Sequence, residues 1–420
     1  MKLLFLSPVG VLGGAERSLL DMVEAVRAER PDVGVAALAC ADGPLVQQLR
    51  ALGVQVAVRE MPESLRSIGD SEDPGALSFL RTALGSRGAS LPGPSLVRYL
   101  GEVREVVREF APDIVHSNGI KTHLLSSALR GTGPRLVWHV RDFLSQRPVV
   151  PSLLRPLAGG VDLCLSNSRA VKEDTERAIP GLRCEVVYNG IDVEAFSPAE
   201  APPLEEDLPA GTFRVGLVGT FARWKGHELF LRAAAYYRAR YADEPPVRFY
   251  VVGGAIYETS NSQVSLPELQ GLADALGVAD SVCFLPFTES PEKAMRALDL
   301  VVNASTRPEP FGRTIVEGMA CERPVLAPAA GGPVEIVSSG QTGWLFPSGS
   351  VEGLAEAIHA AATCTAGQRR EMGRRARADV EARYTRRQLG RALLEAYAAL
   401  SRGGEAAGAA RRRNGWVPSP

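Results

Sequence analysis

Short runs of apolar residues alternate with longer amphipathic segments along most of this 420-residue chain. The runs are rich in Val, Leu and Ile, which is typical of strands buried on both faces, and the segments between them show the spacing of helices. This βα alternation predicts a parallel sheet covered by helices. We expect strands at 3–6, 33–38, 54–58, 114–116, 136–140, 164–166 and 185–187, and again at 213–218, 248–252, 282–285, 300–303, 325–327 and 344–346.

Two stretches interrupt this rhythm. Residues 197–212 are rich in proline and acidic side chains, and they predict a linker between two βα domains of similar size. Residues 62–95 contain several Pro, Gly and Ser residues with a few arginines, and they predict a long, mildly basic loop with one short helix around 77–84. Two such domains imply a cleft between them, with ligands at the carboxyl ends of the strands.

The pattern therefore predicts a first domain over 1–200, a linker over 201–212 and a second domain over 213–382. A long helix follows over 383–400. The tail at 401–420 is rich in Gly, Ala and Arg, and we predict that it is disordered.

Composition narrows the function classes. A formal net charge of −1 does not favour a nucleic-acid partner. The six cysteines are scattered without a CxxC pair, and the five histidines lack metal-ligand spacing, so we expect free thiols and no metal site. The apolar start at residues 3–6 is too short for a signal peptide and fits a first strand. No apolar run is long enough to span a membrane, so the sequence favours a cytoplasmic protein.

One stretch, residues 308–320, combines a loop with the start of a helix. Pro308 and Pro310 keep the loop extended, and the helical pattern begins after Gly312. Glu309 therefore lies on the loop and Glu317 inside the first turns of the helix. The free N–H groups of a helix N-terminus suit a phosphate, and two carboxylates beside them can bind hydroxyl groups. A helix start with ordinary acidic residues is the alternative interpretation.

A second loop, residues 219–226, follows the strand at 213–218. Its glycines and its two cations, Arg223 and Lys225, provide what a diphosphate needs, although an exposed loop with solvated charges has the same composition. Gly253 and Gly254 follow the next strand, where glycine allows a ligand to approach the backbone.

The first domain offers weaker signals. A glycine-rich turn over 10–16 joins its first strand to its first helix, without the GxGxxG spacing of dinucleotide-binding proteins. His139 lies at the end of the strand 136–140, where it can bind a sugar hydroxyl or transfer a proton. His116 lies at another strand end, followed by Asn118. A histidine that merely caps a loop is the alternative for each.

Six ordered motifs together resemble the retaining, nucleotide-sugar-dependent glycosyltransferases of the GT-B fold, in the large family numbered 4. The segment from Glu309 to Glu317 resembles that family's E-x7-E motif. The other five are the glycine loop at 13–16, the V-x-N-G-hydrophobic-D segment at 187–192, the Lys225-Gly226 pair, the G-G-x-x-E segment at 330–337 and the T-G-x-L segment at 342–345.

The resemblance implies a role for each matching residue. Glu309 would hold hydroxyls of the donor sugar, Glu317 would hold the ribose, and Lys225 would neutralise the diphosphate without a metal or other cofactor. His139 would lie under the donor sugar, so that His139, Glu309 and Lys225 form the catalytic group. The donor-binding set would be Gly13, Gly14, Gly219, Arg223, Lys225, Gly253, Glu309, Phe311, Gly312, Arg313, Thr314 and Glu317, with Asn118 and Asn189 on the acceptor side.

One position departs from the family. An arginine commonly follows the glycine that ends the strand at 213–218, and this chain has Thr220 there. Arg223 is three residues further on and is the candidate to replace that arginine. The family's last helix crosses back to the first domain, which fits the helix at 383–400.

The resemblance implies a retaining transferase that moves a hexose-type sugar from a UDP- or GDP-linked donor to a hydroxyl acceptor, such as a glycan, a glycolipid or a natural product. The basic 62–95 loop and the first domain would select the acceptor, and a lipid-linked acceptor would bring the protein to the inner face of the membrane. Two alternatives remain: another GT-B nucleotide-sugar enzyme, such as an epimerase, and a non-catalytic two-domain α/β sugar-binding protein.

Overall fold

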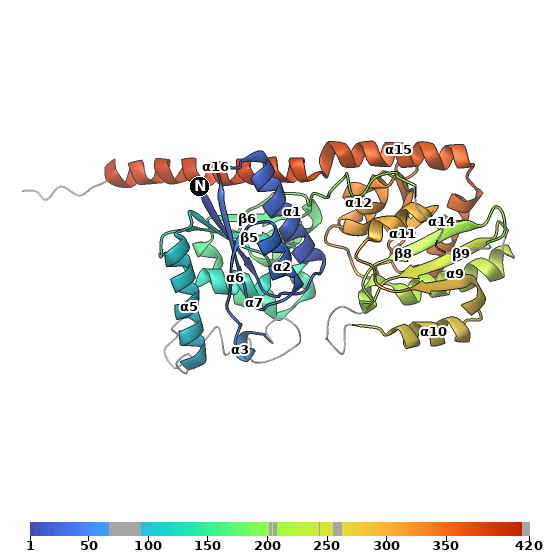
Figure 1. Cartoon of the computed structure of the whole chain (residues 1–420), viewed down its shortest axis with the longest axis horizontal. Coiled ribbons are helices and arrows are strands. Elements are labelled where there is room, and N and C mark those ends of the chain that lie inside the picture. The colour runs from blue at the N-terminus through green and yellow to red at the C-terminus, as the bar shows by residue number, and fades with distance from the viewer. Residues whose placement is uncertain (67–93, 201–203, 205–207, 243, 255–262, 414–420) are drawn as a thin grey trace, which may run out of the picture. The chain divides into compact units, whose positions relative to one another are not determined.

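The computed structural model describes residues 1–66, 94–200, 204, 208–242, 244–254 and 263–413 (Figure 1). The chain forms two compact units. Unit 1 comprises Met1–Gly190 and Arg386–Pro420, and unit 2 comprises Ile191–Thr385. The first unit thus ends at Gly190, before the predicted boundary at 200, because residues 191–200 are part of unit 2. Residues 201–203 and 205–207 of the predicted linker, and residues 67–93 of the predicted long loop, lie outside the described residues.

Unit 1 contains a seven-stranded parallel sheet in the order β3-β2-β1-β4-β5-β6-β7. Its strands are β1 (Lys2–Ser7), β2 (Gly34–Ala39), β3 (Gln55–Val58), β4 (Ile114–Ser117), β5 (Arg135–Val140), β6 (Leu163–Ser166) and β7 (Cys184–Val186). The strand order reverses between β1 and β4, and the loops that follow these strands are where parallel α/β sheets bind ligands.

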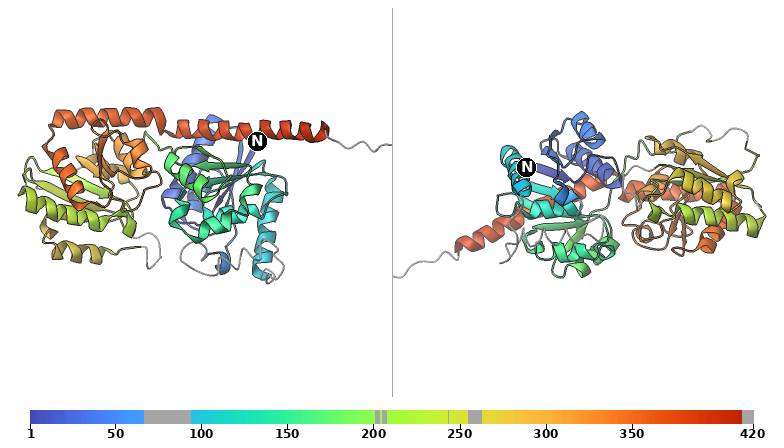
Figure 2. Two further views of the ribbon diagram at one scale, coloured as in Figure 1. Left: turned by 180° about the vertical axis from the view of Figure 1, so that it is seen from behind. Right: turned by 90° about the horizontal axis from the view of Figure 1, so that it is seen from below.

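Helices cover both faces of this sheet, as Figure 2 shows. They are α1 (Gly14–Glu29), α2 (Pro44–Ala51), α3 (Glu63–Arg66), α5 (Pro94–Phe110), α6 (Ile120–Ser127), α7 (Val149–Leu154) and α8 (Arg169–Ala178), with short 3-10 turns at Leu144–Gln146 and Ala158–Gly160. Successive residues of β1 enter different cores. Leu3 and Phe5 pack with α1, whereas Leu4 and Leu6 pack with α5, as the two-residue period of a strand requires.

The last helix, α16 (Arg386–Arg413), packs on α1 through Leu389, Leu393 and Tyr397. Gly390 allows close approach, because a Cβ atom there would lie 2.6 Å from the carbonyl oxygen of Ala25. The structure continues the helix through 401–413, within the stretch for which the sequence predicts disorder; this stretch is rich in Ala and Arg, which favour helices. Residues 414–420 lie outside the described part of the chain.

Unit 2 contains a six-stranded parallel sheet in the order β10-β9-β8-β11-β12-β13. Its strands are β8 (Phe213–Val218), β9 (Val247–Val252), β10 (Val282–Leu285), β11 (Leu300–Val302), β12 (Val325–Pro328) and β13 (Gly343–Phe346). The order reverses between β8 and β11, so unit 2 repeats the topology of unit 1.

The helices of unit 2 are α9 (His227–Tyr241), α10 (Leu266–Ala275), α11 (Pro291–Ala297), α12 (Arg313–Ala320), α13 (Pro333–Ile336), α14 (Val351–Thr363) and α15 (Ala366–Arg383), with 3-10 turns at Arg223–Lys225 and Ala279–Ser281. The sequence pattern did not predict α15. Only Gly373, Ala376 and Val380 of this helix are buried, so the apolar stripe is too narrow to recognise. Thr365 caps its start by accepting the Gln368 N–H.

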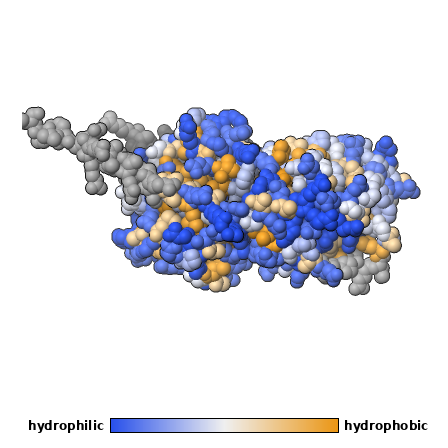
Figure 3. All heavy atoms as spheres, turned by 90° about the horizontal axis from the view of Figure 1, so that it is seen from above, coloured by the Kyte–Doolittle hydropathy of each residue, from blue (hydrophilic) through white to orange (hydrophobic). Residues whose placement is uncertain are grey.

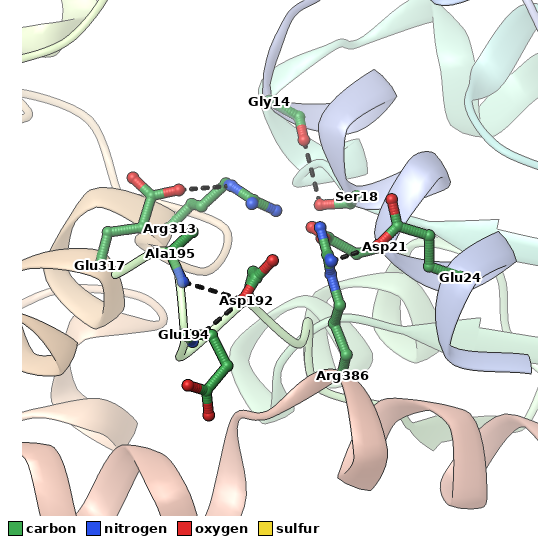
Figure 4. A network of polar contacts seen from close by, with 10 residues as sticks. All are labelled: Gly14, Ser18, Asp21, Glu24, Asp192, Glu194, Ala195, Arg313, Glu317 and Arg386. Carbon is green, nitrogen blue, oxygen red and sulfur yellow. Dashed lines mark hydrogen bonds and ion pairs between the residues drawn. The ribbon is translucent and has the colours of Figure 1, made fainter. Parts of the chain in front are cut away.

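The ends of unit 2 pair with each other. Ile191 and Thr385 form an isolated parallel bridge, and the Ile191 N–H donates to the Tyr384 carbonyl at 2.8 Å. Asp192 then accepts the N–H groups of Glu194 and Ala195, each at 3.0 Å (Figure 4). The two chain crossings between the units are therefore tied together on the unit 2 side.

The face drawn in Figure 3 carries mainly hydrophilic residues with apolar residues between them. Within the described ranges, none of the helices has the length and apolarity that crossing a bilayer requires.

Candidate active site

The site in unit 2 is formed by the loops that follow β8 and β11, the two strands at which the order reverses. Lys225 lies on the first loop and Glu309 on the second. The lysine ammonium contacts both carboxylate oxygens, at 2.8 Å and 3.1 Å. The predicted sugar-side carboxylate and the predicted diphosphate-side cation thus form one ion pair.

This ion pair is largely enclosed by protein. The Glu309 side chain is 8% exposed and the Lys225 side chain 22%. Glu309 also accepts the Ser305 hydroxyl at 2.8 Å and, more weakly, the Asn303 amide at 3.4 Å, while the ammonium lies 4.1 Å from the ring centre of Trp224. These contacts offset the free-energy cost of removing the two charged groups from water.

The two loops are joined by backbone contacts. The Thr306 N–H donates to the Trp224 carbonyl at 2.8 Å. Gly226 has a positive φ of 77°, and a Cβ atom there would lie 1.8 Å from the Ala304 carbonyl oxygen, so only glycine fits. Each residue of the Lys225-Gly226 pair therefore has its own structural role: the lysine supplies charge, and the glycine allows the two loops to meet.

Helix α12 starts directly behind Glu309. Gly312 is its N-cap, with a φ of 106°, and Phe311 is buried with its ring 5.7 Å from that of Tyr384. In the first turns, the Arg313 Nε donates to a Glu317 carboxylate oxygen at 2.6 Å (Figure 4). Both side chains are largely buried, at 16% and 7% exposed. The helix N-terminus thus lies between two carboxylates, each paired with a cation.

The predicted donor-binding glycines after β8 and β9 have different roles. Gly253 is needed for packing, because a Cβ atom there would lie 1.8 Å from the Gly219 carbonyl oxygen. A Cβ atom on Gly219 would meet no atom within 4 Å. The room for a ligand is therefore beside Gly219.

Arg223, the candidate replacement for the missing arginine, pairs with Glu268 at 3.0 Å, and both side chains are about half exposed. This pair takes its guanidinium toward α10, whereas Lys225 pairs with Glu309. Its predicted contact with the diphosphate stays a prediction.

In unit 1, the glycine turn starts α1. The Gly13 N–H donates to a carboxylate oxygen of Glu16 at 3.1 Å, and the Gly14 carbonyl accepts the Ser18 hydroxyl at 3.0 Å (Figure 4). Burial raises the pKa of the Glu16 carboxyl, and its backbone hydrogen bonds oppose this shift. A Cβ atom on Gly14 would meet no atom within 4 Å, so this turn also leaves open space.

Arg141, which the sequence analysis did not select, organises the strand ends of unit 1. It is the first residue after β5. Its Nε donates to the Asn118 side-chain oxygen and its Nη1 to that of Asn189, the latter at 2.6 Å. The two asparagines predicted on the acceptor side are therefore oriented by the same guanidinium. A charged residue immediately after a buried strand is the signal that could have identified it.

His139 lies inside β5 and is 0% exposed. Its Nδ1 lies 3.2 Å from His116 Nε2 and 3.4 Å from Arg141 Nη2, and His116 Nδ1 lies 2.6 Å from the Tyr397 hydroxyl of α16. Burial, with the nearby charge of Arg141, lowers the pKa of both histidines well below the usual value.

The directions of the hydrogen bonds that link Arg141, His139, His116 and Tyr397 follow from Arg141, because a guanidinium can only donate. His139 Nδ1 must then accept, from Arg141 and from the Nε2–H of His116. His116 Nδ1 in turn accepts from Tyr397. The proton of His139 is left on Nε2, which is buried and has no partner among the described residues. That His139 contacts a donor sugar stays a prediction.

Among the described residues, no three His, Cys, Asp or Glu side chains are grouped as metal ligands. All six cysteines are free thiols.

Two Rossmann-like parallel-sheet units, each with glycine-containing loops where its strand order reverses, define a protein of the GT-B architecture. The family model described as "Glycosyl transferases group 1" matches residues 205–379, and the model described as "Glycosyltransferase Family 4" matches residues 12–195. The chain therefore belongs to the group 1, family 4 glycosyltransferases.

Curated relatives include two D-inositol 3-phosphate glycosyltransferases. The protein of Mycobacterium tuberculosis is 36% identical over 220 residues, which is 51% of this chain and 43% of that protein. The protein of Mycobacteroides abscessus is 36% identical over 181 residues, 42% of this chain and 38% of that protein. The matched stretch thus spans less than half the length of these relatives.

Solved structures agree over nearly the whole chain. Anabaena HepE, solved with UDP and glucose, has a TM-score of 0.75 at 25% identity and covers 95% of this chain and 99% of its own. Sucrose-phosphate synthase from Thermosynechococcus elongatus has a TM-score of 0.74 at 18% identity, covering 96% and 100%, which supports the fold alone.

Proposed function

We propose that this protein is a retaining glycosyltransferase that moves a hexose-type sugar from a nucleotide-diphosphate sugar to a hydroxyl acceptor. The observation that carries the proposal is the largely enclosed ion pair of Lys225 and Glu309 beside the N-terminus of α12. A cation and helix N–H groups suit a diphosphate, and an adjacent carboxylate suits sugar hydroxyls.

UDP is the nucleotide that we favour over GDP. The support comes from Anabaena HepE, which was solved with UDP and with UDP-glucose and resembles this chain over 95% of its length. We extend this ligand class to the site of unit 2, where Glu317 would accept the ribose hydroxyls.

The chemistry that we propose needs no metal or organic cofactor. The bond between the sugar C1 and the diphosphate oxygen breaks, and C1 bonds to the acceptor oxygen on the same face. The acceptor proton passes to the departing diphosphate. Lys225 and the α12 N–H groups stabilise the negative charge that grows on the diphosphate, and such preorganised electrostatic stabilisation is usually the largest contribution to catalysis.

On the acceptor side we propose Asn118 and Asn189, which Arg141 orients. The His139 side chain is 0% exposed and contacts Arg141, so we propose that it also positions this guanidinium, in addition to its predicted contact with the sugar. The acceptor would be a glycan, a glycolipid or a small natural product. The free thiols support a reducing, cytoplasmic location, with a peripheral membrane contact if the acceptor is lipid-linked.

The test is a transfer assay with a panel of UDP- and GDP-sugars and hydroxyl acceptors, followed by mass spectrometry of the products. We expect a glycosylated product and a free nucleoside diphosphate, with the anomeric configuration of the donor retained in the NMR spectrum. Glu317→Ala should abolish donor use, whereas its thermal unfolding should show that the fold is intact. Wild-type turnover by Glu317→Ala would show that the site is wrong.

The alternatives give different results in this assay. An epimerase-like enzyme would change the sugar without releasing it to an acceptor, and a binding protein would retain the ligand without any turnover.

A further inference from the structure

The ammonium of Lys225 is occupied by a carboxylate in this structure. Both oxygens of Glu309 contact it, at 2.8 Å and 3.1 Å. A diphosphate that binds at Lys225 has to share this ammonium with Glu309. The Glu309 carboxylate then lies within a few ångström of a second group of negative charge.

The surroundings prevent Glu309 from turning away easily. Its carboxylate also accepts from Ser305, and its own backbone carbonyl accepts the Gly332 N–H at 2.8 Å. Gly331 has a φ of 70°, and a Cβ atom there would lie 2.4 Å from the Glu309 carbonyl oxygen. The carboxylate is thus fixed by its hydroxyl partner and by the backbone behind it.

Little solvent is available to screen the repulsion. With the Glu309 side chain 8% exposed, the charges interact through protein, where the effective dielectric constant is well below that of water. A negative charge fixed at this place disfavours a diphosphate. The same charge favours the positive character that develops on the sugar carbon while the bond to the diphosphate breaks.

We propose that Glu309 weakens the binding of the free nucleoside diphosphate to the site and so promotes release of this product. The inference rests on the proposed function, and it gives Glu309 a role in addition to binding sugar hydroxyls. It has an uncommon consequence: removing this carboxylate should tighten the binding of the nucleoside diphosphate while impairing transfer.

Glu317 provides the matched control. It is also a buried carboxylate of the same segment, but it pairs with Arg313, at 2.6 Å (Figure 4). If it holds the ribose, its loss removes a favourable contact. The same Glu→Gln change should therefore have opposite effects at the two positions.

The experiment is isothermal titration calorimetry of the full-length protein with UDP, repeated with GDP. We expect Glu309→Gln to bind the nucleoside diphosphate about tenfold more tightly than the wild type, because the ammonium is no longer shared and one repulsion is removed. Glu317→Gln should bind more weakly. In a Lys225→Met background, Glu309→Gln should still tighten binding, because the repulsion remains, but by a different factor, since the two charges are coupled.

Glu309→Ala serves as a second variant, and thermal unfolding checks that each variant is folded. Unchanged or weaker binding by folded Glu309→Gln and Glu309→Ala, beside measurable wild-type binding, would overturn the inference and leave the proposed function standing. If neither UDP nor GDP binds to the wild type or to any variant, the proposed function fails and this inference fails with it.

Discussion

The carboxyl ends of the parallel strands in units 1 and 2 share one topology but differ in chemistry. In unit 2, the loops after β8 and β11 carry Lys225 and Glu309, with the Arg313–Glu317 pair close behind on α12. In unit 1, Arg141 after β5 binds Asn118 after β4 and Asn189 after β7, supported by neutral histidines. The first arrangement places two cations beside carboxylates, and the second fixes uncharged amides around one guanidinium.

This difference indicates a division of work. Charges that are paired when the site is empty can be shared with a charged ligand such as a diphosphate. Amides fixed in one orientation are better suited to hydroxyl groups, whose hydrogen bonds depend on direction. We therefore attribute donor binding to unit 2 and acceptor binding to unit 1, and the predictions below test this contrast.

The largest effect is expected at Lys225. Lys225→Met should lower kcat/KM for the donor by about 10²- to 10³-fold, because the growing charge on the diphosphate loses its cation. Arg223→Met is the matched control from the same loop. Since Arg223 pairs with Glu268 near the surface, we expect Arg223→Met to lower kcat/KM for the donor by less than about tenfold. Steady-state kinetics with varied donor would measure both, and equal losses would show that Arg223 replaces the missing arginine.

Arg141→Lys should act on the acceptor instead. Lysine keeps the charge but lacks the planar fork that reaches Asn118 and Asn189 together. We expect kcat/KM for the acceptor to fall by about tenfold or more, as for the loss of one or two oriented hydrogen bonds, with the affinity for UDP unchanged. Bisubstrate kinetics and a UDP titration separate the two. If the affinity for UDP fell by as large a factor as kcat/KM for the acceptor, the assignment of donor binding to unit 2 and acceptor binding to unit 1 would be wrong.

The units should also differ in their response to acid. In unit 1, burial lowers the pKa of His116 and His139 well below the usual range and that of His123 to about 3; in unit 2 it lowers the pKa of His227 to about 4. The folded units keep these groups neutral, whereas the unfolded chain binds protons below about pH 6.5, so stability is lost as the pH falls.

Each of these histidines should lower the free energy of unfolding by about 1.4 kcal/mol for every pH unit below about 6.5. Hydrogen–deuterium exchange at pH 7.5 and 5.5, corrected for intrinsic rates, should therefore show β4 and β5 losing more protection than β8 and β9. His123→Phe should reduce the loss in unit 1. Equal losses in both sheets would contradict this.

The smallest effect is expected from a chelator. Because we assign the stabilisation of the diphosphate to Lys225 and the α12 N–H groups, excess EDTA should leave the transfer rate within about twofold of the untreated rate. Strict dependence on a divalent cation, with activity restored by Mg²⁺ or Mn²⁺, would overturn the metal-free mechanism.

Much of the fold could be predicted from the sequence because strands of a parallel sheet are buried on both faces and appear as continuous apolar runs. Helix α15 could not, since only Gly373, Ala376 and Val380 of it are buried and its exposed faces are charged. The sequence also did not indicate how far α16 continues, because a stretch rich in Gly and Arg predicts disorder where the structure has helix.

The candidate site was predicted unevenly. The sequence motifs selected Lys225, Glu309 and Glu317. The structure shows that Lys225 and Glu309 pair between neighbouring loops and that Glu317 pairs with Arg313 on α12. In unit 1 the motifs drew attention to His139, which lies inside its strand, and passed over Arg141, the first residue beyond it. Spacing alone does not reveal which residue at a strand end leaves the core.

The most direct test of the account is a crystal structure of the full-length protein with UDP. The account predicts the diphosphate within hydrogen-bond distance of the Lys225 ammonium and of the first N–H groups of α12, with the ribose hydroxyls on Glu317. A UDP molecule bound elsewhere, with Lys225 still held by Glu309 and Glu317 still paired with Arg313, would contradict it.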